Sequence, residues 1–256
     1  MIPHLLSQIF LSSCDLLMIK SIVGEASAGI YSVSYTISNI LYTISLQIFK
    51  PWSPWVYRRI ENKETDSIKE NSKLIMHIVW IGIFTIAPEL IKLFINSEYG
   101  EASLIVPPIC LGIFFQMMYT FFYDIEYYHK KNKQIAIFSV ITAVINIILN
   151  YVAIHIWGYQ AAAYTTIVSY MILCILHYFG MRKIDKTQYY DLKTLLVLSS
   201  VLILITLANV IFNNSILIRY IILIFSGIYI LIRYRELIKD MLNKFRKKKM
   251  ISEKGE

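Results

Sequence analysis

The chain has 256 residues, of which 57% are hydrophobic and 16% are charged, and its mean hydropathy is +0.56. A soluble domain has about 45–50% apolar and about 25% charged residues, so this composition excludes an ordinary soluble domain. Much of the net charge of +8 comes from the segment 239–249 and from short segments between apolar runs. Basic residues in such places fit a membrane surface and argue against nucleic-acid binding.

Eight apolar runs follow one another along the chain. Each is long enough, or nearly so, to cross about 30 Å of hydrocarbon as a helix. The predicted spans are 2–19, 28–49, 74–95, 104–123, 135–156, 159–179, 192–212 and 216–232. The predicted fold class is therefore an all-α integral membrane protein with about eight transmembrane helices.

Lysine and arginine residues gather in alternate connections, at 50–73, 130–133 and 182–186, and in the carboxyl-terminal tail. The segments 97–103 and 213–215 contain neither residue, and nor does the turn at Gly158. By the positive-inside rule, both termini and the basic connections lie on the cytoplasmic side of the cell (inner) membrane. An even number of spans agrees with this orientation.

Polar side chains recur at helical spacing in the first six predicted spans, whereas the last two spans are almost entirely Leu, Ile and Val. Helices turn such polar faces toward one another or toward a water-filled cavity. We therefore expect residues 1–184 to form a six-helix lobe with a hydrated cavity wall, and residues 185–256 to form two peripheral helices with a basic tail. The residues predicted to contact a substrate are Asp15, Gln8, Tyr31, Tyr35, Arg58, Gln116, Asn146 and Asn150.

Ionisable residues at membrane depth are candidates for function because their insertion costs a few kcal/mol. Asp15 allows three interpretations: contact with a substrate, cation or proton; an ion pair with Lys20; or a hydrogen bond to a neighbouring helix. Glu89 and Lys92 are three residues apart and predict an ion pair near the outer surface.

A second group of ionisable residues ends the fourth predicted span. Asp124, Glu126 and His129 stand beside Lys130 and Lys131. We interpret this segment as a mixture of charges at the membrane surface rather than as a metal site or a general base.

Motifs of catalysis are missing from the sequence. It contains no Walker loop, nucleophile elbow, zinc-binding His-Glu-x-x-His or dinucleotide fingerprint. The remaining histidines and the three cysteines are far apart and have no metal-ligand spacing: His77, His155, His177, Cys14, Cys110 and Cys174. We therefore expect no enzyme activity, no metal and no cofactor.

Several local strings occur in order along the chain: PHLL at 3–6, CDLLMI at 14–19, AGIYSVSY at 28–35, FKPWSPWVY at 49–57, NIILNY at 146–151 and GYQAAA at 158–163. Together they resemble the second lobe of the polysaccharide flippases, the O-antigen and capsule repeat-unit family of the multidrug/oligosaccharidyl-lipid/polysaccharide exporter superfamily. Leu16 departs from the pattern, because the family usually has an arginine there.

The resemblance implies two six-helix lobes around a central cavity that opens to each side in turn, with two added helices in some members. This chain would then be the second lobe with those two helices, completed by a first lobe or a second copy. The implied substrate is an undecaprenyl-pyrophosphate-linked oligosaccharide moved across the membrane for surface polysaccharide, capsule or lipopolysaccharide synthesis. Glycosyltransferases and a glycan polymerase are implied as partners.

Three alternatives remain open from the sequence. One is a drug or cation exporter of the same superfamily. Another is a membrane enzyme of polysaccharide assembly, a polymerase or ligase, which would carry a large outer loop with several Arg and His residues. The third is a subunit that only scaffolds a glycan-assembly complex.

Overall fold

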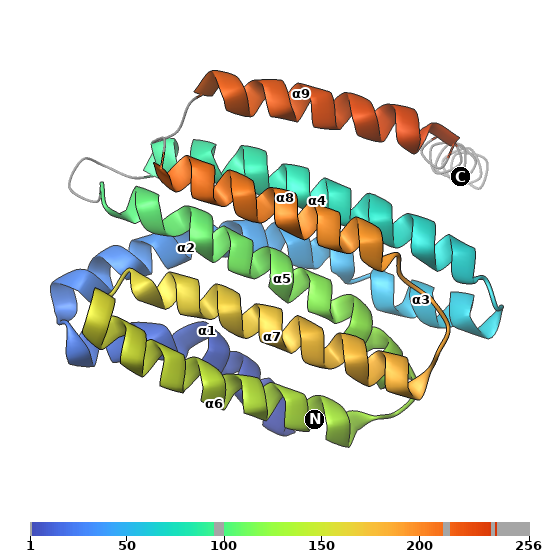
Figure 1. The fold of residues 1–256 in the computed structure, drawn as a ribbon, viewed down its shortest axis with the longest axis horizontal. Helices are drawn as coiled ribbons and strands as arrows, with labels where there is room; N and C mark the ends of the chain where they lie inside the picture. The colour runs from blue at the N-terminus through green and yellow to red at the C-terminus, as the bar shows by residue number, and fades with distance from the viewer. Residues whose placement is uncertain (1, 95–99, 212–215, 237–238, 240–256) are drawn as a thin grey trace, which may run out of the picture. The chain divides into compact units, whose positions relative to one another are not determined.

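The computed structural model describes residues 2–94, 100–211, 216–236 and 239. Within these ranges the chain forms helices and no strand (Figure 1), which confirms the all-α prediction. The helices are α1 (Ile2–Ile22), α2 (Glu25–Phe49), α3 (Trp52–Glu61), α4 (Thr65–Phe94), α5 (Ala102–Tyr128), α6 (Asn132–Trp157), α7 (Ala161–Ile184), α8 (Leu192–Ile211) and α9 (Ile216–Arg233).

The chain forms two compact units, Met1–Asn214 and Ser215–Glu256. The larger unit contains α1 to α8, and the smaller one contains α9. Helix α8 packs against α4 and α5 of the larger unit. The predicted division at residues 184 and 185 separates a transporter lobe from added helices and stays a prediction.

Helix α5 is the central helix of the larger unit. It packs against α2, α3, α4, α6, α7 and α8, and Figure 1 shows α7 on one side of it and α4 and α8 on the other. Most of its side chains are buried, and Phe114, Phe121 and Ile125 are completely inaccessible. The core of this unit therefore surrounds α5.

Helix α6 shows how polarity is distributed in this unit. Its buried face carries Ser139, Asn146 and Asn150, whereas Val144 and Ile148 are exposed. This is the reverse of a soluble amphipathic helix, whose apolar stripe faces the core. An exposed apolar face of this length is suited to lipid, which offers no hydrogen bonds to a polar side chain.

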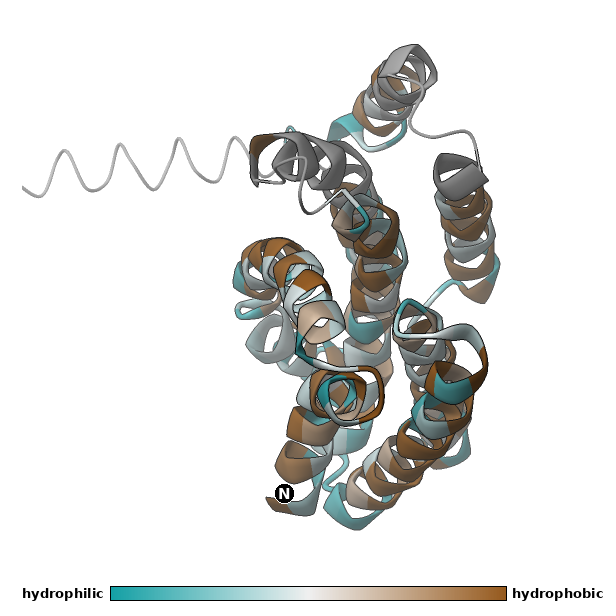
Figure 2. Cartoon of the chain, turned by 90° about the vertical axis from the view of Figure 1, so that its left-hand side faces the viewer, coloured by the Kyte–Doolittle hydropathy of each residue, from teal (hydrophilic) through white to brown (hydrophobic). Residues whose placement is uncertain are grey.

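Three of the described helices, α5, α6 and α7, are long and apolar enough to cross a membrane. Helix α1 is a fourth if its halves Ile2–Leu11 and Ser13–Ile22, inclined by 46°, form one span. Figure 2 shows hydrophobic residues along the helices and hydrophilic residues near several connecting turns. The chain is thus a membrane protein by helix length and composition, while eight spans and the orientation of the termini stay predictions.

The basic connection at 50–73 contains a helix that the sequence interpretation did not include. In α3, Trp52 and Val56 are buried, while Arg58 and Arg59 occupy the last turn, where cations complement the helix dipole. Trp52 packs edge-on against Phe121 of α5, with ring centroids 5.0 Å apart.

Some sequence predictions concern residues outside the described part of the chain. The structure does not describe the side chains of Glu89 and Lys92, the end of the predicted span 74–95, or most of the basic tail. The ion pair between Glu89 and Lys92 and the cytoplasmic position of the tail stay predictions.

Candidate functional site

Asp15 lies on the buried side of α1, where it is 1% exposed. Its Oδ2 atom accepts a hydrogen bond of 2.6 Å from the Tyr31 hydroxyl of α2, and Oδ1 accepts one of 3.1 Å from the Leu16 backbone N–H. Lys20 instead forms an ion pair with Glu25, 2.9 Å away. The structure shows the third of the three interpretations of Asp15, a hydrogen bond to a neighbouring helix.

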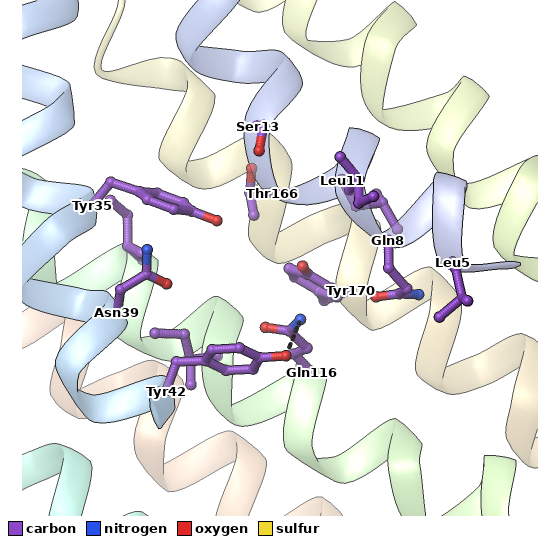
Figure 3. Close-up of a pocket in the computed structure, with 13 residues that line it drawn as sticks. Leu5, Gln8, Leu11, Ser13, Tyr35, Asn39, Tyr42, Gln116, Thr166 and Tyr170 are labelled. Atoms are coloured by element: carbon purple, nitrogen blue, oxygen red, sulfur yellow. Dashed lines mark hydrogen bonds between the residues drawn. The ribbon is translucent and has the colours of Figure 1, made fainter. Parts of the chain in front are cut away.

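A pocket of about 540 Å³ lies beside this contact, among α1, α2, α5 and α7 (Figure 3). We call it the α1–α2 pocket. Ile109 and Ile113 of α5 and Tyr170 of α7 are buried lining residues, whereas Asn39 of α2 and Ser13 of α1 are exposed ones. The pocket therefore opens on the side of α1 and α2. Its further lining residues are Leu5, Gln8, Ile9, Leu11, Tyr35, Tyr42, Gln116 and Thr166.

The polar groups of the α1–α2 pocket are amides and hydroxyls, and none of its lining residues is charged. Figure 3 shows Asn39 and Tyr42 directed toward Gln116 and Tyr170 across the pocket. The Gln116 Nε2 atom donates to the Tyr42 hydroxyl over 3.4 Å. The buried Nε2 atom of Gln8 has no hydrogen-bond partner among the described residues.

These groups determine what the α1–α2 pocket can bind. Amides and hydroxyls both donate and accept hydrogen bonds, and tyrosine rings offer flat apolar faces. A few such polar groups on an apolar background are typical of small-ligand sites. The pocket is suited to an uncharged ligand that carries many hydroxyl groups.

Three of the predicted site residues, Gln8, Tyr35 and Gln116, come together in the α1–α2 pocket. Asp15 and Tyr31 lie next to it as the contact between α1 and α2, and neither lines it. Tyr42, Asn39 and Tyr170 line the pocket but were not among the predicted residues; Tyr42 belongs to the same polar face of its helix as Tyr31 and could have been selected on that signal.

Asn146 and Asn150 lie elsewhere and connect α6 to α7. Asn146 Nδ2 donates to Ser169 Oγ over 3.0 Å, and Asn150 Nδ2 donates to Asn146 Oδ1 over 3.2 Å. The Thr165 hydroxyl donates to the Asn150 side-chain oxygen. Both asparagines are at most 1% exposed. Their contact with a substrate stays a prediction, while their contacts in the structure hold two helices together.

Arg58 is exposed on α3, where its Nε atom donates to the Pro54 carbonyl over 3.3 Å. It does not line the α1–α2 pocket. The structure therefore does not bring this cation to the neutral groups that surround the pocket.

Several polar residues of the first six predicted spans are turned toward other parts of the protein, which is one of the two arrangements expected for such polar faces, while the hydrated wall stays a prediction. His4 and Ser38 are buried in protein contacts, at 5% and 1% exposure. His4 Nδ1 lies 2.7 Å from Ser139 Oγ of α6, and the Ser38 hydroxyl donates to the Ser34 carbonyl over 2.9 Å. In lipid, polar side chains stabilise helix packing in this way, so a polar stripe alone does not identify a cavity.

The burial of Asp124 and Glu126 contradicts their interpretation as part of a charge mixture at the membrane surface. Asp124 is 3% exposed and accepts a hydrogen bond of 2.8 Å from Ser53 of α3. Glu126 is completely buried and lies 2.6 Å from His177 of α7. His177 was taken as an isolated histidine, because no pattern in the sequence connects residues this far apart.

No group of three or more His, Cys, Asp and Glu side chains in the described part of the chain could hold a metal ion. The α1–α2 pocket is thus the candidate functional site, and its chemistry is that of hydrogen bonding and aromatic contact. Comparison of the chain with protein-family models, with curated proteins and with solved structures finds no match.

Proposed function

We propose that this chain is one lobe of a membrane transporter that moves a lipid-linked oligosaccharide across the cytoplasmic membrane for surface polysaccharide synthesis. The observation that carries the proposal is the uncharged α1–α2 pocket, with amide and tyrosine side chains in a protein whose outer helix faces are apolar. In this proposal the chain has eight spans, and both termini are cytoplasmic.

The chemistry of the α1–α2 pocket supports a glycan as the group that it contacts. Sugar hydroxyls can exchange their bonds to water for bonds to Gln116, Asn39 and Tyr42, and sugar rings can pack on the tyrosine faces. The polyprenyl tail remains in the bilayer, which costs no transfer of apolar surface into water. A pyrophosphate would need cations from outside the pocket, because no lining residue carries a charge.

The open side of the α1–α2 pocket is where a second lobe, or a second copy of this chain, would complete a cavity. A cation exporter is the weaker alternative, because no acidic residue lines the pocket and the Asp15 carboxylate already accepts a hydrogen bond from Tyr31. A polymerase or ligase has less support, since no carboxylate, histidine or lysine that could act as a general base lines the α1–α2 pocket.

The test uses the full-length protein in a bacterial strain that lacks its repeat-unit flippase, with surface polysaccharide as the measurement. We expect the wild type to restore the polysaccharide. The double variant Gln116→Leu, Tyr170→Phe should reduce it roughly thirtyfold, because it removes two hydrogen-bonding groups of about 1 kcal/mol each. Ile148→Leu, on the exposed face of α6, is the matched control and should behave like the wild type. Full restoration by the double variant at normal protein level would contradict the proposal.

A further inference from the structure

A second pocket, of about 560 Å³, lies between α6 and α7. We call it the lysine pocket, because Lys130, Lys131, Lys133 and Lys183 are among its lining residues. The other side of the pocket is apolar and includes Ile137, Leu176 and Phe179. None of these residues lines the α1–α2 pocket, so the two pockets are separate.

The lysines come together because α6 and α7 are antiparallel neighbours. The two helices pack against each other and are joined by the short turn between Trp157 and Ala161. The beginning of α6 and the end of α7 are therefore at the same level, as Figure 1 shows. Lys133 lies in the first turn of α6, and Lys183 lies in the last turn of α7.

No residue that lines the lysine pocket compensates its charge, and the buried Glu126 behind Gln134 is in contact with His177 instead. All four lysines are exposed, and no acidic residue lines the pocket. None of the four forms an ion pair with a described residue. The free backbone N–H groups at the beginning of α6 add to the positive potential. Four cations that converge without a counter-ion predict an anionic ligand.

The apolar side of the lysine pocket restricts the kind of anion. Ile137 is 45% exposed and Phe179 is 65% exposed, although both belong to helices that are apolar enough to cross a membrane. In a bilayer crossed by these helices, lysines at the helix ends lie at the depth of the lipid headgroups. A cationic rim above an exposed apolar surface suits an amphiphile better than a free anion in water.

We propose that the lysine pocket binds an anionic phospholipid of the surrounding bilayer. Its phosphate lies among the lysines, and the first part of its acyl chains lies along Ile137, Leu176 and Phe179. The proposal is independent of transport, because it involves none of the residues that line the α1–α2 pocket.

The test measures lipid selectivity of the full chain in phosphatidylcholine bilayers that contain spin-labelled phosphatidylglycerol or spin-labelled phosphatidylcholine. We expect the protein to immobilise the phosphatidylglycerol probe preferentially. The variant Lys133→Gln, Lys183→Gln should lower this preference roughly fivefold or more, since each lysine near an anionic lipid contributes a comparable factor. The matched control Lys50→Gln, Lys63→Gln removes two exposed lysines outside the pocket and should keep the preference.

Three results would overturn the proposal. One is an unchanged preference in the Lys133→Gln, Lys183→Gln variant. Another is an equal loss in both double variants, which would show a general effect of surface charge. In the third, inorganic phosphate abolishes the preference while chloride at equal ionic strength does not, which would identify a site for free phosphate. Equal effects of the two salts are the expected result.

Discussion

The carboxylate of Glu126 and the imidazole of His177 lie 2.6 Å apart, and neither side chain is exposed. Gln134 donates a hydrogen bond of 2.9 Å to the other oxygen of Glu126. Side chains from α5, α6 and α7 thus meet at one carboxylate in the interior of the larger unit. A charged group in such a place depends on its partners, because no water can replace them.

Replacing His177 with Leu should lower the free energy of unfolding by about 3–5 kcal/mol, because it leaves a buried carboxylate without its partner. Thermal unfolding of the detergent-solubilised protein measures the effect. Adding Glu126→Gln to this variant should recover part of the stability, since the uncompensated charge is then removed.

His155→Leu is the control for this variant. His155 is exposed on α6, and its ring nitrogen contacts only the Tyr151 carbonyl of the same helix, at 2.7 Å. It should unfold almost like the wild type. Equal stability of His177→Leu and His155→Leu would show that the buried pair does not stabilise the fold.

Gly180→Ala should destabilise the protein by about 1–3 kcal/mol through overpacking. A Cβ atom at this position would lie 2.2 Å from Glu126 Oε1 and 2.5 Å from both Gln134 Nε2 and Phe138 Cε2. Movement of Glu126 would disturb its bond to His177. Gly29→Ala is the matched control, because its Cβ would meet nothing within 4 Å. Alanine at residue 29 should stabilise α2 by up to about 1 kcal/mol, and a similar loss in both variants would contradict the packing argument.

The connection after α7 should loosen in acid because of Asp185, which lies 3.3 Å from His129. Burial alone would raise the pKa of Asp185, but hydrogen bonds from Tyr189 and Thr187 and the nearby His129 charge lower its pKa to about 2. A carboxyl group whose pKa is lower in the folded state stabilises that state above its unfolded pKa of about 3.9. This contribution is lost as the pH falls from about 4 toward about 2.

Limited digestion by an acid protease between these pH values would measure the loosening of the 185–191 connection. Asp185→Asn should be cleaved there even at the upper end of the range and should show little pH dependence. Asp66→Asn, at an exposed position in the first turn of α4, should keep the behaviour of the wild type. If the wild-type connection resists cleavage equally at all pH values in this range, Asp185 does not hold the connection in place.

The α1–α2 pocket should be accessible to water, whereas the exposed apolar face of α6 should face lipid. In a variant without the cysteines at residues 14, 110 and 174, Asn39→Cys should react with a membrane-impermeant maleimide. Ile148→Cys should not react, despite the 57% exposure of the native side chain, because a thiol in hydrocarbon does not ionise. Labelling yield by mass spectrometry decides the question. If neither cysteine is labelled, the pocket is not hydrated, and the proposed function is wrong.

Much of the helical architecture could be predicted from the sequence. The predicted spans 104–123, 135–156 and 159–179 lie within or almost within α5, α6 and α7, and these helices are long and apolar enough to cross a membrane. Helix α3 was missed because its ten residues include one proline, two arginines and a glutamate, so that hydropathy alone assigns the segment to a loop. The likeness of short strings to polysaccharide flippases stays a prediction.

The sequence by itself determined most of the long helices, because hydropathy and helical periodicity depend on neighbouring residues alone. Only the tertiary structure decided which polar side chains meet. Gln8 and Asp15 share the polar face of α1, yet Gln8 lines the α1–α2 pocket and Asp15 accepts a hydrogen bond from Tyr31. Glu126 and His177 are 51 residues apart and become partners only when α5 packs against α7. The physical reason is that hydrogen bonds act over about 3 Å, so a side chain's partner depends on the packing of distant helices.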